Sequence, residues 1–138
     1  MITLFGRLFS PVTPPTDGLS QGQREAIVDL LYFCMCADQR LLPVENAAIA
    51  DEVATFNWDP TIKFETFAAQ SLQRAQLAVA APKTRETMLL DIGNQLVTTE
   101  TKTRAITLCP QIFRADGEYA PAERAVFVEI KRSFGWPD

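Results

Sequence analysis

Most of the chain consists of segments in which apolar residues recur every three or four positions, the spacing of one face of an α-helix. The first, residues 21–37 (QGQREAIVDLLYFCMCA), is apolar on nearly all sides, which is typical of a helix at the centre of a bundle. No stretch sustains the alternation of a strand between turn signals. The pattern predicts an all-α fold, a bundle of about six helices. The later helices are expected over about 43–58, 61–79, 84–98, 101–114 and 121–134.

The first twenty residues have a different character. They carry a short apolar stretch and then several residues that break regular structure, which are Pro11, Pro14, Pro15 and Gly18. We therefore divide the chain into an N-terminal arm, 1–20, and a helical domain, 21–138. The apolar spacing of Ile2, Leu4, Phe5, Leu8 and Phe9 allows one amphipathic turn at a membrane surface. Because Arg7 is the single basic residue of this stretch, packing of the arm against the domain is favoured.

Length and charge narrow the class of protein. A chain of 138 residues corresponds to about one domain. A net charge of -4 and a pI near 4.8 argue against nucleic acid as a partner, since a phosphate backbone requires a clustered basic surface. No apolar run reaches the ~18–20 residues of a membrane-spanning helix, and the opening is too sparsely basic for a signal sequence. These features predict a cytoplasmic protein without an integral membrane segment.

The reactive side chains argue against an enzyme. The chain has no histidine, which removes histidine-based triads and the usual zinc catalysis. Neither a glycine-rich phosphate loop nor a nucleophile elbow occurs. Cys34, Cys36 and Cys109 lie in apolar surroundings and are expected to be buried thiols in a reducing compartment. Cys34 and Cys36 cannot chelate one ion together, because helical residues two apart point about 200° from each other.

Two segments of the chain match each other without gaps. Residues 37–58 read ADQRLLPVENAAIADEVATFNW, and residues 115–136 read ADGEYAPAERAVFVEIKRSFGW. Seven of the 22 aligned positions are identical, whereas unrelated segments of this length share about one or two. The identical pairs are Ala37/Ala115, Asp38/Asp116, Pro43/Pro121, Glu45/Glu123, Ala47/Ala125, Phe56/Phe134 and Trp58/Trp136. We interpret the segments as two related helical hairpins, each with the pattern A-D-x4-P-x-E.

That pattern, which closes one helix and opens the next, resembles the TerB-like family named for tellurite resistance. The likeness covers about residues 21–136. It implies an all-helical bundle with an internal duplication and a non-enzymatic role in stress response. It also implies that a divalent cation binds to acidic loop residues, which at the matching positions are Asp38, Glu45, Asp116 and Glu123.

The physical chemistry of these carboxylates leaves two explanations open. A glutamate at the third helical position meets free backbone N–H groups and the positive end of the helix dipole, which stabilises a helix by ~0.3–1 kcal/mol without any metal. That explanation does not account for an Asp seven residues before each Glu. Carboxylates placed together repel each other unless a cation joins them.

An all-oxygen site without histidine suits Ca²⁺ or Mg²⁺, and Zn²⁺ less naturally. Asp51 and Glu129 each follow the glutamate by six residues, a rotation of about 240° on a helix, and are excluded from the site. The alternative function is a protein–protein adaptor, similar to a co-chaperone, in which the carboxylates only stabilise helix ends. The sequence does not determine the oligomeric state.

Overall fold

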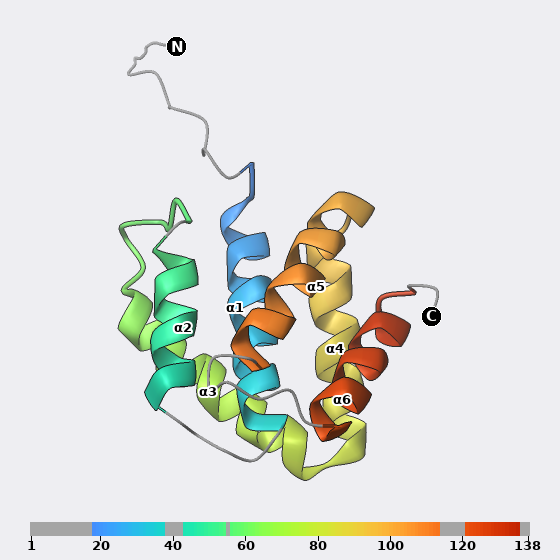
Figure 1. The fold of residues 1–138 in the computed structure, drawn as a ribbon. Helices are drawn as coiled ribbons and strands as arrows, with labels where there is room; N and C mark the ends of the chain where they lie inside the picture. Colours follow the sequence, from blue (N-terminus) through green and yellow to red (C-terminus); the bar gives the residue numbers. More distant parts are fainter. Residues whose placement is uncertain (1–17, 38–42, 55, 114–120, 136–138) are drawn as a thin grey trace.

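The structure, a computed structural model, describes residues 18–37, 43–54, 56–113 and 121–135. Within these ranges the chain forms six helices and no strand, so the prediction of an all-α bundle is confirmed (Figure 1). The helices are α1 (Gln21–Ala37), α2 (Pro43–Val53), α3 (Phe64–Ala80), α4 (Pro82–Leu96), α5 (Thr99–Phe113) and α6 (Pro121–Ser133).

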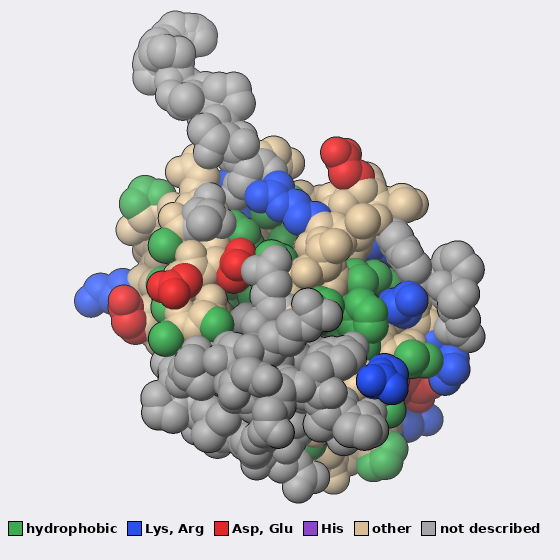
Figure 2. Space-filling model, in the orientation of Figure 1, with side chains coloured by type: hydrophobic (Ala, Val, Ile, Leu, Met, Phe, Trp, Pro, Cys, Tyr) green, Lys and Arg blue, Asp and Glu red, His purple; other side chains and the backbone are tan. Residues whose placement is uncertain are grey.

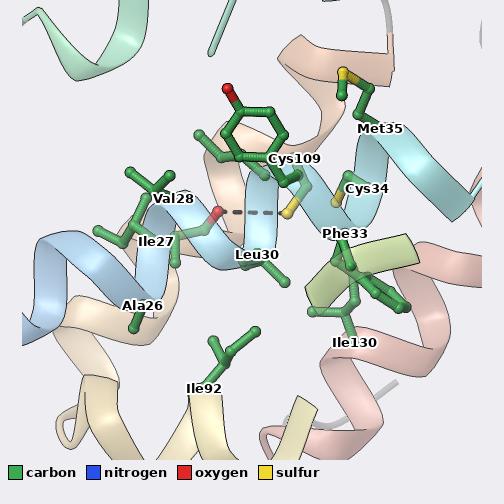
Figure 3. Close-up of a cluster of buried hydrophobic side chains, with 14 of the residues drawn as sticks. Ala26, Ile27, Val28, Leu30, Phe33, Cys34, Met35, Ile92, Cys109 and Ile130 are labelled. Carbon is green, nitrogen blue, oxygen red and sulfur yellow. Dashed lines mark hydrogen bonds between the residues drawn. The ribbon is translucent and has the colours of Figure 1, made fainter. Parts of the chain in front are cut away.

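Helix α1 is the centre of the bundle, as its sequence, apolar on nearly all sides, predicts. It contacts all five other helices. Ile27, Val28 and Phe33 are completely buried although they leave the helix in different directions. Figure 3 shows Leu30 pointing toward Ile92 of α4, and Phe33 beside Ile130 of α6. Burial on every side explains why this helix carries so few charged residues, since an unpaired charge in the core is costly.

Helices α3 and α4 form a tight hairpin that packs along α1. The single residue between them, Ala81, has extended backbone angles, and Pro82 follows as the first residue of α4. Proline suits this position because its missing N–H would have no partner within the helix. Ser71, Ala75 and Ala78 are the buried residues of α3. These small side chains allow the α3 backbone to approach α1 closely.

The remaining helices make contacts that are symmetrical in part, since α6 also packs against α4 whereas α2 contacts only α1 and α5 among the described helices. Helix α2 contacts α1 and α5, helix α6 contacts α5 and α1, and α1 contacts α5. The helix starts are also related. Gln21 and Thr99 begin α1 and α5, and Pro43 and Pro121 begin α2 and α6, so both pairs of starts are 78 positions apart. This is the offset at which residues 37–58 match residues 115–136.

Helix α2 is shorter than the sequence pattern suggested. It ends at Val53, whereas the apolar stripe predicted a helix that continues nearly to Trp58. The chain leaves the helix because Trp58 packs against α3: its ring lies 5.3 Å from that of Phe64 and 5.4 Å from that of Phe67, measured between centroids. Its indole N–H donates a hydrogen bond to the Ile62 carbonyl at 2.8 Å. Contacts with another helix therefore outweigh continuation of the local pattern.

The cysteine prediction is confirmed for burial. Cys34, Cys36 and Cys109 are all buried thiols, and Cys109 Sγ donates to the Ala105 carbonyl at 3.6 Å (Figure 3).

At the surface, basic side chains gather over α6 in Figure 2. Lys131 and Arg132 lie in the last turn of this helix, where positive charge favours the negative end of the dipole. Among the helices described, none has the length and apolarity needed to cross a membrane.

Candidate functional site

The four predicted ligands are only partly placed. Asp38 and Asp116 lie outside the described residues. Glu45 and Glu123 lie in α2 and α6, but their side chains are not among those described. Since α2 and α6 begin at proline, each glutamate is the third helical residue, as the sequence predicted.

The helix ends that flank these carboxylates lie toward one end of the bundle. In Figure 1 the last turns of α1 and α5 and the first turns of α2 and α6 are all in the lower half of the view. Contacts of α1 with α2, α5 and α6 tie these four helices together. Among the described side chains, no group of three or more Cys, Asp or Glu residues is arranged to hold a metal ion.

The described part of the chain also contains an open groove that the sequence did not reveal. It lies between α1, α3 and α4 and has a volume of about 600 Å³, within the ~300–1,000 Å³ range of ligand pockets. Ala26, Met88 and Ile92 give it an apolar lining. Leu77 stands at its edge and is 60% exposed. Leu77 thereby adds exposed apolar surface to the apolar lining of the groove.

One wall of the groove is held by a charged cluster. Asp29 of α1 accepts hydrogen bonds from Ser71 Oγ at 2.6 Å and from Arg74 Nη2 at 2.7 Å, both on α3. Ser71 is fully buried, whereas the Arg74 side chain is 44% exposed. The Arg74 guanidinium also lies 5.2 Å from the centre of the Phe67 ring. This cluster fixes the distance between α1 and α3 and neutralises the charge of Asp29.

The two ends of the groove differ in charge. At one end, where Gly22 of α1 meets Gln95 of α4, the lining carboxylates are Glu25 and Asp91. Glu25 accepts a hydrogen bond from Gln21 Nε2 at 3.3 Å. At the other end, Lys83 lies in the first turn of α4, beyond the neutralised Asp29. The groove is therefore acidic at the α1 N-terminus and basic toward the α3–α4 connection.

The architecture defines a class, a helical bundle built around one buried central helix. Comparisons with protein-family models, with curated proteins and with solved structures find no match.

The sequence contains one indication of the groove that our interpretation of the pattern did not include. Glu25 and Asp29 are the two carboxylates of a mainly apolar helix and are four residues apart, so they share one face. Two carboxylates on one face of a central helix indicate a place where that helix reaches the surface. The partners of Asp29 on α3 could not be predicted, because Ser71 and Arg74 are 42 and 45 positions from Asp29 in the chain.

Proposed function

We propose that this chain is a non-enzymatic, TerB-like helical module that binds a divalent cation through Asp38, Glu45, Asp116 and Glu123. Ca²⁺ and Mg²⁺ are the preferred ions, because oxygen ligands without histidine suit hard cations. Zn²⁺ is the less natural choice.

One observation carries the proposal: the carboxylates and the helix starts share a single offset. Asp38 and Asp116, and Glu45 and Glu123, are 78 positions apart, as are the starts of α1 and α5 and of α2 and α6. A helix-end role explains a glutamate in each first turn, but it does not explain the retention of both aspartates. We infer a duplicated hairpin whose two acidic segments lie at one end of the bundle and share a cation, which offsets their repulsion.

The test is a thermal melt of chelator-treated protein with Ca²⁺, Mg²⁺, Mn²⁺ or Zn²⁺ added in turn. An ion that binds only the folded state stabilises it by ~2.7 kcal/mol at 100 times Kd. For a domain of this size that raises Tm by several degrees. The double variant Asp116→Asn with Glu123→Gln should lose most of this response.

The matched control is Asp51→Asn with Glu129→Gln. It removes the same two charges at positions that are also 78 apart but lie off the proposed site. Because Glu129 Oε1 is 3.9 Å from Arg85 Nε, the control protein has a slightly lower baseline Tm, but its ion response should match the wild type. A wild type indifferent to all four ions at millimolar concentration contradicts the proposal. Equal loss in the control would reduce the effect to general charge screening.

The second candidate is a protein–protein adaptor, favoured by the groove between α1, α3 and α4. An apolar groove with an exposed leucine at its edge fits a segment of protein rather than an ion. The two functions differ in their dependence on the carboxylates. Partner binding that survives Asp116→Asn with Glu123→Gln supports the adaptor, and binding that requires the added ion supports the cation module.

A further inference from the structure

We propose that the groove between α1, α3 and α4 is the binding site of the chain's own N-terminal arm, with residues 2–9 as the occupant. The arm lies outside the described residues, and its chemistry is read from the sequence. The inference concerns a different surface from the cation site and does not depend on it. It competes with the adaptor candidate, because a groove filled by the arm is closed to a partner protein.

The first argument is position. Gly18 and Leu19 lead directly into α1, and Leu19 is already buried. Gly18 has a φ of +70°, a conformation that glycine adopts without strain. Gly22, the second residue of α1, lines the groove at its acidic end. The arm therefore joins the domain beside the end of the groove where Glu25 and Asp91 lie.

The second argument is reach. Residues 10–17 separate the apolar stretch from Gly18, and eight residues span up to ~26 Å when extended. The part of α4 that lines the groove runs from Lys83 to Gln95, about 18 Å at 1.5 Å per residue. The apolar stretch can thus reach any point of the groove from its own attachment site.

The third argument is complementarity. Five of the eight residues in 2–9 are large and apolar, and Arg7 is the only charged one. The groove offers an apolar lining with Met88 and Leu77, and carboxylates at the end nearest the arm's attachment. A volume of about 600 Å³ accommodates several side chains of this size. With the apolar side chains of the arm in the groove, Arg7 can lie near Glu25 and Asp91. The apolar surfaces of arm and groove are then buried together, and the opposite charges are paired.

The test uses thiol labelling of the full-length chain. Because Cys34, Cys36 and Cys109 are buried, they give a low background for a cysteine introduced in the arm. Leu4→Cys is expected to react with a thiol reagent at least tenfold more slowly than Thr13→Cys, which lies between the apolar stretch and α1. Equal rates at the two positions would overturn the proposal.

Charge reversal tests whether the groove is the surface that protects the arm. Glu25→Lys with Asp91→Lys should raise the labelling rate of Leu4→Cys toward that of Thr13→Cys. Glu86→Lys is the control, since Glu86 is exposed on the same helix as Asp91 and does not line the groove. Protection that survives the double reversal, or that Glu86→Lys removes equally, contradicts the assignment.

Two further outcomes separate other occupants. Protection that is constant over a hundredfold dilution supports binding within one chain. Protection lost on dilution would assign the groove to the arm of a second copy. Protection that appears only when anionic phospholipid vesicles are added would assign the arm to a membrane surface instead. Loss of protection on dilution and protection that requires vesicles would each overturn the proposal.

Discussion

The hydroxyl oxygens of Ser20 and Thr98 hold the same place at the starts of α1 and α5. Each accepts a hydrogen bond from the backbone N–H three residues later, Gln23 and Thr101 respectively, and both bonds measure 3.1 Å. Such a contact satisfies one of the N–H groups that a helix start leaves without an intrahelical partner. The two residues are 78 positions apart, so this offset also relates two helix caps that lie outside the segments that match in sequence.

We predict that loss of either cap destabilises the fold. Ser20→Ala and Thr98→Ala should each lower the free energy of unfolding by ~1 kcal/mol, because an alanine cannot accept the N–H. Urea denaturation measures the change. Thr84→Ala is the control, since Thr84 is exposed within the first turn of α4 and alanine has the higher helix propensity. A cost at Thr84 equal to that at Thr98 would show that capping is not the cause.

Two helical glycines should respond oppositely to alanine. At Gly93 of α4, an added Cβ would lie 3.0 Å from Cδ1 of Phe134, whose ring is buried against the helix. Gly93→Ala should therefore cost ~1–3 kcal/mol in overpacking. At Gly22 the atom in the way is the amide end of Gln95, a flexible and exposed side chain that can move.

Gly22→Ala should be neutral or stabilise by up to ~1 kcal/mol, since alanine loses less backbone entropy than glycine. Thermal and urea unfolding of both variants provide the comparison. Phe134→Leu combined with Gly93→Ala tests the steric cause, because the smaller side chain should remove part of the overpacking cost. If the two glycine variants lose equal stability, the close approach of α4 and α6 is not what requires Gly93.

Asp29 should be needed as a hydrogen-bond acceptor more than as a charge. Asp29→Ala leaves the buried hydroxyl of Ser71 without this acceptor, which costs ~1–3 kcal/mol. Asp29→Asn keeps an oxygen at that position and should cost less. The ion pair with Arg74 contributes below ~1 kcal/mol, because the Arg74 side chain is 44% exposed and water screens its charge. Urea denaturation of the two variants decides between these roles, and equal costs would assign the effect to charge.

The turn after α2 should contribute to stability in a pH-dependent way. The backbone N–H and the hydroxyl of Thr61 donate to Asp59 Oδ1 at 2.8 and 2.7 Å. The backbone bond first, and the hydroxyl bond second, lower the pKa of the Asp59 carboxyl below its ordinary value of 3.8. A pKa lower in the folded state means that the stabilisation is present above the unfolded pKa and is lost as the pH falls through the folded pKa.

Asp59→Asn removes the ionisation but keeps the shape of the side chain. Wild type should therefore be more stable than this variant at pH 7, and the difference should shrink as the pH falls below about 4. Urea denaturation from pH 7 to about pH 3 measures the difference. A difference that stays constant over this range would rule out the Asp59 carboxylate as its source.

The elements predicted correctly are those specified by neighbouring residues. The bounds of α1 were predicted as 21–37, and the starts of α2 and α6 as Pro43 and Pro121. A run of apolar residues and a proline in the first turn specify a helix through residues only a few positions apart. The sequence therefore predicts these helix bounds. For the same reason Glu45 and Glu123 were placed at the third position of their helices, although their role as ligands stays a prediction.

The elements predicted less well depend on distant contacts. Helix α2 ends at Val53 because Trp58 packs against Phe64 and Phe67, and helix α3 begins at Phe64 after the turn held by Asp59. A helical pattern continues through both places, so local periodicity gave no warning. Packing between helices decided these boundaries.

The sequence by itself determined that this is an all-helical chain with α1 at its centre and two matched acidic segments, because periodicity, burial and repetition are properties of residue order. Only the tertiary structure decided that Asp29 would meet Ser71 and Arg74, and that Gly22 would face Gln95. Those contacts set the width of the groove. They depend on how three helices cross, and crossing geometry arises from the summed packing of many side chains, which no local pattern records.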